Sequence, residues 1–101
     1  MKTDYRSFAE FYPFYLGEHQ NTISRRLHVI GTSLVCVIFL SALFSNHFQL
    51  LWLLPLVGYS FAWVGHYVFE KNRPATFQYP LYSLMGDFTM AWQVISRQIA
   101  W

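Results

Sequence analysis

Two long apolar runs that almost touch in the sequence constrain what this chain can fold into. Residues 27–45 and residues 48–69 contain no Asp, Glu, Lys or Arg. Each run meets the requirement of about 20 residues for a helix that crosses a hydrocarbon core about 30 Å thick. Only Asn46 and His47 separate the runs, and so short a connection predicts an antiparallel transmembrane hairpin. Pro55 is expected to kink the second helix, which a membrane helix tolerates.

The composition favours a membrane protein. Hydrophobic residues make up 54% of the 101 residues and charged residues make up 12%, about half the charged share of a soluble protein. A soluble protein of this size would lack the polar sequence needed to cover two buried helices of such length. We therefore expect residues 1–101 to form a single all-α domain embedded in a membrane.

Charge and cysteine content exclude two other kinds of site. The net charge is +2 and no dense basic run is present, so the sequence argues against binding to nucleic acid. The single cysteine, Cys36, lies inside the first apolar run, where it forms neither an intramolecular disulfide nor a thiolate metal site. Any bound metal must then be held by nitrogen and oxygen atoms.

The basic residues predict how the hairpin is oriented. Lysine and arginine are enriched on the cytoplasmic side of membrane proteins. Four precede the first apolar run, two directly follow the second, and the connection has none. Both ends of the hairpin should therefore face the cytoplasm. The membrane would be the inner membrane in a bacterium or the endoplasmic reticulum in a eukaryote. These basic residues are Lys2, Arg6, Arg25, Arg26, Lys71 and Arg73.

The segments that flank the hairpin read as shorter elements. Residues 3–16 are aromatic with scattered charge, which predicts a helix lying in the membrane interface and ending near Pro13. Residues 71–80 contain two prolines and are expected to form an ordered loop. Residues 82–101 predict an amphipathic or partly buried helix that opens near Ser83, with a third membrane span as the alternative.

The spacing of three histidines brings two of them to one depth. His28 lies 19 residues before His47, and His66 lies 19 residues after it. At about 1.5 Å per residue, both imidazoles are about 28 Å from the connecting loop. Folding the hairpin at that loop therefore places His28 and His66 together near the cytoplasmic boundary.

Two stripes of side chains place the same histidines on facing sides of the helices. Residues spaced by four, three and four lie along one side of a helix. Two such stripes that share a depth should face each other. The first stripe is Asn21, Arg25, His28 and Thr32, and the second is Tyr59, Trp63, His66 and Glu70.

Carboxylates accompany these histidines. His66 and Glu70 are four residues apart, so a helix can present a nitrogen and a carboxylate to one ion. Glu18 and His19 come just before the first helix, where a turn can fold them back over the same place. Each residue alone is also compatible with an interfacial or solvated position, but together they indicate a site, because unpaired ionisable groups in a span are costly.

The residue types narrow the chemistry without choosing the metal. Histidines and carboxylates without a thiolate suit iron(II), zinc or manganese, and two histidines plus one carboxylate hold iron in non-haem oxygenases. No Ser-His-Asp order, nucleophile elbow or HExxH motif is present, so hydrolysis by a standard nucleophile or zinc motif has little support. His47, in the opposite loop, is expected to lie outside the site.

Two segments resemble a known family. They are FYLGEHQNTISRRLHVIGT, residues 14–32, and GYSFAWVGHYVFEKNRPATFQYPLYSLMGDFTM, residues 58–90. The combined pattern, EHxNxxxRxLHxxGT followed by GHxxFEKNRPATF and SLxGDF, is similar to the signature blocks of the Mpo-type 2-hydroxy fatty acid dioxygenases. The likeness covers most of the chain outside the termini and the hairpin tip.

This resemblance implies an activity and a set of site residues. It implies an iron(II)-dependent membrane enzyme that uses dioxygen to shorten a 2-hydroxy fatty acid by one carbon, the oxidative step of fatty acid α-oxidation. Histidines at the positions of His19, His28 and His66 are then metal-binding or catalytic. Acidic positions of the pattern match Glu18, Glu70 and Asp87, without fixing which of them is a ligand.

The sequence thus leads to one hypothesis and two alternatives. The three histidines, with a carboxylate from Glu70, Asp87 or Glu18, are predicted to bind iron(II), and Arg25 or Arg73 to pair with the substrate carboxylate. The partners are a 2-hydroxy fatty acid, dioxygen and membrane lipid, and an oligomer is compatible with the sequence. The alternatives are a non-enzymatic membrane module for assembly or lipid binding and a zinc-dependent lipid hydrolase or transferase.

Overall fold

The computed structural model describes residues 4–101, and this part of the chain consists of helices and connections without a strand. The prediction of an all-α fold is confirmed. Lys2 and Thr3, which entered the predictions of orientation and of the first helix, lie outside the described residues. In chain order the elements are α1 (Phe8–Gly17), α2 (Thr22–Ser45), η1 (Phe48–Trp52), α3 (Leu53–Val64), η2 (Gly65–Glu70), η3 (Ala75–Phe77) and α4 (Pro80–Ile95).

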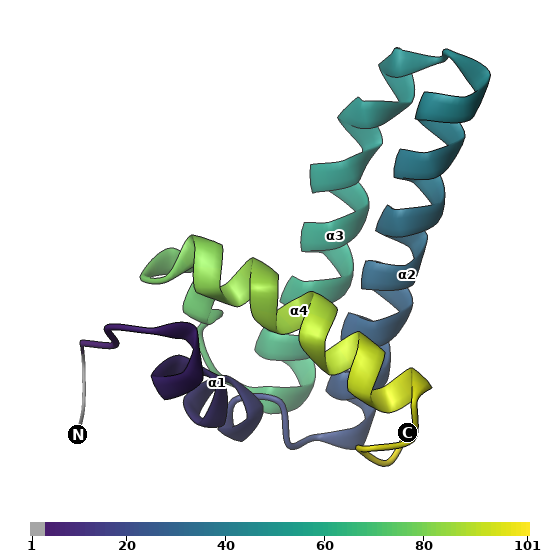
Figure 1. Cartoon of the computed structure of the whole chain (residues 1–101). Helices are drawn as coiled ribbons and strands as arrows, with labels where there is room; N and C mark the ends of the chain where they lie inside the picture. Colours follow the sequence, from purple (N-terminus) through teal and green to yellow (C-terminus); the bar gives the residue numbers. More distant parts are fainter. Residues whose placement is uncertain (1–3) are drawn as a thin grey trace.

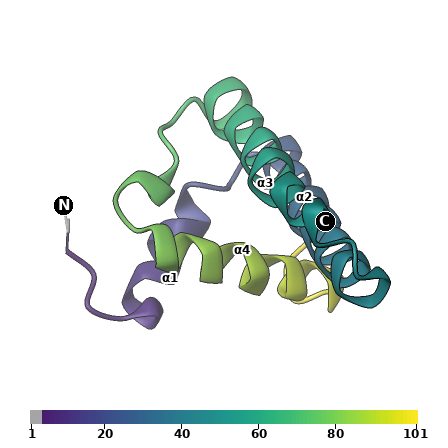
Figure 2. The same ribbon diagram turned by 90° about the horizontal axis from the view of Figure 1, so that it is seen from above.

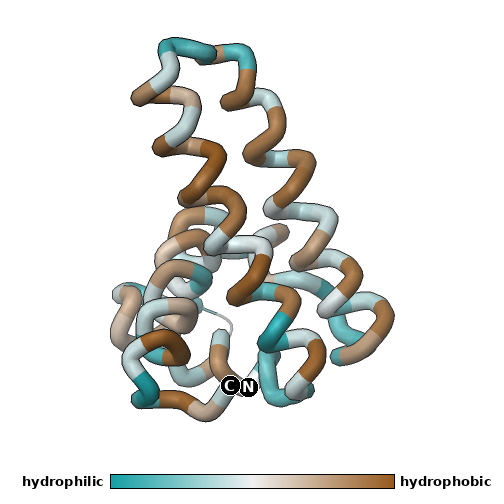
Figure 3. The backbone as a smooth tube through the Cα atoms, turned by 90° about the vertical axis from the view of Figure 1, so that its right-hand side faces the viewer, coloured by the Kyte–Doolittle hydropathy of each residue, from teal (hydrophilic) through white to brown (hydrophobic). Residues whose placement is uncertain are grey.

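Two helices in the described range are long and apolar enough to cross a membrane: Thr22–Ser45 and Phe48–Glu70. They lie side by side, and the chain turns back between them (Figure 1). The turn follows α2 directly, with Asn46 as the C-cap residue. Asn46 has a left-handed backbone with a φ of 59°, a conformation that asparagine tolerates better than most residues. Hydrophobic residues recur along both helices, and polar ones gather at the turn (Figure 3).

The first of these helices begins at Thr22, earlier than the apolar run that predicted it. The Asn21 side chain accepts hydrogen bonds from the backbone N–H groups of Ile23, at 3.0 Å, and Ser24, at 3.1 Å. Such an N-cap satisfies N–H groups that the first helical turn leaves without a partner. The helix therefore includes Arg25 and Arg26, which the count of uncharged residues left out.

The second apolar run is a composite helix. A 3₁₀ turn, η1, leads into α3, and α3 continues into a π-helical segment, η2. Pro55 occupies the third position of α3, where the missing N–H belongs to the first turn and breaks no necessary bond. The π-helical segment ends at Lys71, whose φ of 58° is left-handed. Wider π turns are rare and are frequently found at functional sites.

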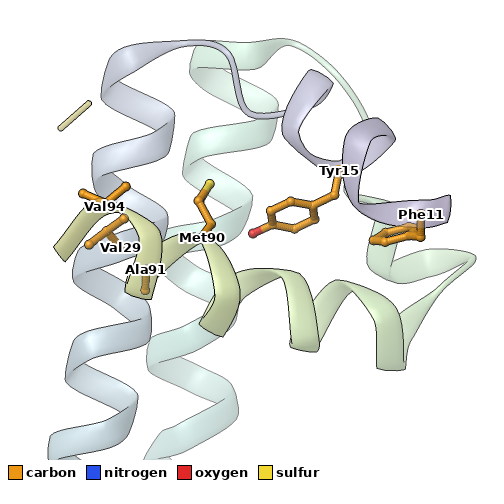
Figure 4. Close-up of a cluster of buried hydrophobic side chains, with 6 residues drawn as sticks. All are labelled: Phe11, Tyr15, Val29, Met90, Ala91 and Val94. Carbon is orange, nitrogen blue, oxygen red and sulfur yellow. The ribbon is translucent and has the colours of Figure 1, made fainter. Parts of the chain in front are cut away.

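Helices α1 and α4 pack together against one end of the α2–α3 pair (Figures 1 and 2). Their contact is a cluster of buried side chains from three helices, in which the Tyr15 ring extends from α1 toward α4 (Figure 4). Helix α4 has 16 residues and is not among the candidate spans of the described chain. The buried cluster contains Phe11, Tyr15, Val29, Met90, Ala91 and Val94.

The prediction that the first interfacial helix ends near Pro13 is wrong. Helix α1 continues through Pro13 to Gly17. Phe11 and Tyr15, on either side of the proline, are buried almost completely, and this packing holds the helix together. Pro13 has no N–H group to donate to the carbonyl of Ala9, four residues earlier. Ala9 is exposed, so solvent can supply the missing hydrogen bond.

Candidate metal centre

Three histidines from separate segments converge where α1, α2 and η2 meet. The ring centroids are 4.2 Å apart for His19 and His28, 4.6 Å for His19 and His66, and 4.8 Å for His28 and His66. One nitrogen from each ring lies within 4.8 Å of the other two. All three side chains are buried, with 1% to 3% of their surface exposed. The predicted meeting of His28 and His66 is confirmed.

Gly65 lets the two long helices approach closely at this level. A Cβ atom at Gly65 would lie 2.8 Å from the Oγ atom of Ser24 and 3.0 Å from the Cε1 atom of His28. The first distance is shorter than real Cβ contacts and the second is tighter than most of them, so a larger residue would displace the Ser24 and His28 side chains or move η2 away from α2. Because His66 follows directly, the missing side chain of Gly65 is what brings His66 to His28.

Hydrogen bonds fix the orientation of all three rings. In each histidine the Nδ1 atom faces an oxygen acceptor, so Nδ1 carries the proton and Nε2 keeps its lone pair. Acceptors of this kind set the tautomer and direction of metal-binding histidines. They are the carbonyl oxygen of Tyr15 at 2.7 Å for His19, that of Ser24 at 2.9 Å for His28, and the Oδ1 atom of Asn72 at 2.7 Å for His66.

The chemistry of the donor set fits a metal ion. The Nε2 atom of His19 is buried and has no hydrogen-bond partner in the described structure. Burial, followed by the nearby ring of His28, lowers the pKa of His19 well below its ordinary value, so this imidazole is neutral at pH 7. Neutral imidazole nitrogens are ligands for iron, zinc and other transition metals, and coordination would satisfy the buried nitrogen.

The three carboxylates of the predicted site lie near the histidines and form hydrogen bonds with other groups of the protein. None belongs to the three-histidine group among the described residues. Glu70 accepts a hydrogen bond at 2.7 Å from the backbone N–H of Asn21, at the start of α2. Glu18 accepts one at 2.8 Å from the side-chain amide of Asn72. The Glu70 contact ties η2 to α2, and a carboxylate ligand beside the three histidines stays a prediction.

Asp87 supports the site through Tyr15. The Tyr15 hydroxyl donates a hydrogen bond to Asp87 at 2.5 Å, and the Tyr15 ring stacks on His19 with centroids 4.1 Å apart. Burial raises the pKa of Asp87 to about 6, although the bond from Tyr15 acts in the opposite direction. Burial and the neighbouring Asp87 raise the pKa of Tyr15 well above its ordinary value, so the phenol keeps its proton.

The two arginines predicted to pair with a substrate carboxylate have other contacts. The Nε atom of Arg25 donates a hydrogen bond at 3.2 Å to the carbonyl of His19, which holds the connection between α1 and α2 in place. Arg73 is exposed, with its guanidinium 4.6 Å from the centre of the Phe77 ring. Neither side chain lines the cavity beside the histidines. His47 is exposed at the turn between α2 and η1.

A large cavity opens from the histidines and runs along α2 and α3. Its volume is about 960 Å³, its walls are mainly apolar, and α4 covers its side near the histidines. The sequence motifs predicted neither that α4 forms a wall of this cavity nor that Asn72 contacts His66. The SLxGDF block nevertheless lies in α4, and Asn72 lies in the FEKNRPATF block. Most of the cavity lining comes from Thr32, Val35, Cys36, Phe39, Leu40, Leu54, Pro55, Gly58, Tyr59, Phe61, Ala62, Trp63, Leu81, Ser83, Leu84 and Phe88.

Comparison with known families agrees with this combination of three histidines and an apolar cavity. The family described as 2-hydroxy-palmitic acid dioxygenase Mpo1-like matches residues 5–99. The chain belongs to this family. The Mpo1-like match includes all three clustered histidines and both candidate spans, and it confirms the resemblance read from the sequence motifs. No curated protein and no solved structure matches the chain.

Proposed function

We propose that this Mpo1-like chain is an iron(II)-dependent dioxygenase that converts 2-hydroxy fatty acids into fatty acids one carbon shorter. The observation that carries the proposal is the position of three buried imidazoles at one end of a long apolar cavity. The family description supplies the reaction class, because it names a dioxygenase of 2-hydroxy-palmitic acid. The cavity supplies a place for the acyl chain next to the nitrogen ligands.

His19, His28 and His66 would hold the metal through their Nε2 atoms. Their Nδ1 contacts keep the rings in place before the ion binds, which limits the reorganisation that binding requires. Bound iron(II) supplies the redox chemistry that activation of dioxygen requires. Zinc also binds three histidines, but it does not change its oxidation state, so the dioxygenase description of the family favours iron.

The cavity would hold the acyl chain with its polar head at the histidines. Leu40, which lines the far part of the cavity, lies twelve residues beyond His28 along α2, or about 18 Å away. One leaflet of hydrocarbon is about 15 Å thick, so an acyl chain of membrane length fits this distance. Apolar walls also exclude water from the reacting end.

The proposed reaction balances with dioxygen as the oxidant. The bond between C1 and C2 breaks, and C1 leaves as carbon dioxide. The carbon C2 becomes the carboxyl carbon of the shorter fatty acid, and one molecule of water is formed. The protein's own part is to bind the acid, to hold C1 and C2 beside the three imidazoles and to keep bulk water out.

We further propose that α2 and the η1–α3–η2 helix form an antiparallel transmembrane hairpin, with residues 1–101 as one membrane-embedded domain. The side-by-side arrangement of the two helices, which are hydrophobic along most of their length (Figure 3), supports this placement, as do the many exposed hydrophobic side chains that they carry. The basic residues near the histidine end favour a cytoplasmic position for that end. A fatty acid in the bilayer would then carry its carboxylate at the depth of the site.

Metal analysis and oxygen uptake test the proposed function. We expect protein purified without oxygen to contain iron, and to consume dioxygen when 2-hydroxypalmitate is added, with pentadecanoate as the product detected by mass spectrometry. Palmitate, which lacks the 2-hydroxyl group, is the matched control and should cause no uptake. Zinc in place of iron would favour a hydrolase, and protein without metal would favour a non-enzymatic membrane module.

A further inference from the structure

Ser83 on α4 carries a buried hydroxyl group that the fold does not use. The side chain is 6% exposed, and its Oγ atom has no hydrogen-bond partner in the described structure. The residue is part of the cavity wall, together with all three histidines. A buried hydroxyl without a partner is unfavourable, so its presence at a binding cavity points to a ligand.

Several other hydroxyl groups in the helices are satisfied internally. Ser33, Ser60 and Thr89 donate to the carbonyl four residues earlier, at 2.8, 2.5 and 2.7 Å. Ser24 is also buried without a partner, but it faces Gly65 across the helix contact and does not line the cavity. Ser83 therefore combines an unused hydroxyl with a position at the cavity.

The position of Ser83 belongs to the polar end of the cavity. Asp87 is four residues further along α4, so the two side chains share one face of the helix at a separation of about 6 Å. Asp87 accepts the hydrogen bond of Tyr15, and Tyr15 stacks on His19. Asp87 and Tyr15 are thus committed to each other, while the Ser83 hydroxyl is not.

We propose that Ser83 positions the substrate by donating a hydrogen bond to its carboxylate. This inference rests on the proposed function, because it assumes that a fatty acid occupies the cavity with its head near the histidines. A hydroxyl has one proton to donate, and rotation about a single bond directs it along the wall. A carboxylate is a stronger acceptor than a neutral oxygen. Arg25 and Arg73 do not line the cavity, so neither side chain is placed to bind the substrate carboxylate there.

Binding of two ligands with the same tail tests the proposal. The probes are palmitate and hexadecanol, measured without oxygen by displacement of radiolabelled 2-hydroxypalmitate from the iron-loaded protein in detergent micelles. Ser83→Ala should weaken palmitate binding about tenfold or more and leave hexadecanol binding unchanged. Ser60→Ala is the matched control, because Ser60 is exposed, is bonded to Leu56 and does not line the cavity.

The stability of Ser83→Ala separates binding from a structural role. Removal of an unsatisfied hydroxyl should leave the melting temperature equal or higher. Unchanged palmitate affinity, or an equal loss for both probes, would overturn the proposal. If the parent protein oxidises 2-hydroxypalmitate while Ser83→Ala binds palmitate normally, the proposed function stands without this inference. If palmitate binding depends on Ser83 but no dioxygen is consumed, the inference stands and the proposed reaction fails.

Discussion

The Nδ1 atom of His66 lies 2.7 Å from the Oδ1 atom of Asn72. The amide nitrogen of Asn72 donates at 2.8 Å to Glu18, so one side chain links η2 to the segment that carries His19. We expect Asn72→Ala to lower metal affinity about 10- to 100-fold, because His66 loses the acceptor that fixes its tautomer and direction. Titration of the metal-free protein with iron(II), without oxygen, measures this change.

The matched control for Asn72 is Gln78→Ala in the same connecting segment. Gln78 is exposed, and its hydrogen bond to the Ala75 carbonyl is made by the backbone N–H rather than by the side chain. This variant should bind iron as the parent protein does. Equal affinity in Asn72→Ala and Gln78→Ala would show that the orientation of His66 does not depend on Asn72.

The four histidines of the chain should divide into two groups. His19, His28 and His66 are buried in one cluster, whereas His47 is exposed at the turn at the far end of the α2–α3 pair. Replacing any clustered histidine with Ala should abolish the retention of iron through purification, because each variant has only two of the three imidazole ligands. His47→Ala should keep the iron content of the parent, as measured by plasma mass spectrometry. Similar metal contents in all four variants would contradict a three-histidine site.

Gly65 and Gly17 should respond in opposite ways to alanine. A Cβ at Gly65 would lie 2.8 Å from the Ser24 Oγ atom, whereas a Cβ at Gly17 would have nothing within 4 Å. We expect Gly65→Ala to destabilise the protein by about 1–3 kcal/mol through overpacking and to weaken metal binding, because η2 must move away from α2. Gly17→Ala should be neutral or slightly stabilising. Unfolding in detergent micelles, followed by circular dichroism, would contradict the argument if the two variants behaved alike.

The parts of the fold and the site that the sequence predicts depend on fixed helical geometry. The equal spacing of His28 and His66 from the turn, at the rise of an α-helix, predicted one depth for both, and the two rings do meet although the second run also contains a 3₁₀ and a π segment. The two candidate spans followed from length and apolarity alone. The family motifs identified His19, whose position depends on a turn that periodicity does not describe.

The remaining features depend on tertiary contacts that local patterns do not encode. Pro13 usually ends a helix, but the burial of Phe11 and Tyr15 keeps α1 intact around it. The α-helical spacing of His66 and Glu70 did not predict that η2 is π-helical or that Glu70 accepts a hydrogen bond from the backbone of Asn21. Asn72 lies in a connection, where no periodicity shows which way a side chain points.

Asp87→Asn should change how stability depends on pH. The pKa of Asp87 is raised from 3.8 to about 6, so the folded protein binds this proton more tightly than the unfolded chain does. Its contribution to stability is present below about pH 4 and is lost as the pH rises through about 6. At pH 7, Asp87→Asn should therefore be more stable by about 3 kcal/mol, since one pKa unit corresponds to about 1.4 kcal/mol.

The measurement is the difference in unfolding free energy between the two metal-free proteins from pH 4 to pH 7. Burial lowers the pKa of His19, which acts in the opposite direction: its contribution is lost as the pH falls. Both proteins contain His19, so the difference between them isolates Asp87. A difference that stays constant across this range would contradict a raised pKa of Asp87.

Gly58 should limit the length of the acyl chain that the cavity accepts. It lies in the cavity wall, and a Cβ there would meet only Val35, at an ordinary distance of 3.5 Å. A Cβ atom therefore fits at this position of the cavity wall without disturbing the helix contact. Gly58 is eight residues before His66 along the helix, about 12 Å from the site, so Gly58→Phe should exclude the distal part of a long chain while leaving room for a short one.

Oxygen uptake with 2-hydroxyoctanoate and 2-hydroxypalmitate measures this limit. For Gly58→Phe we expect kcat/KM to fall at least tenfold with 2-hydroxypalmitate and to change little with 2-hydroxyoctanoate, because each methylene removed from an apolar site costs about 0.8 kcal/mol. Leu56→Phe adds an aromatic ring at an exposed position outside the cavity wall and should leave both values unchanged. An equal loss for both substrates would mean that the acyl chain does not run along α3 past Gly58.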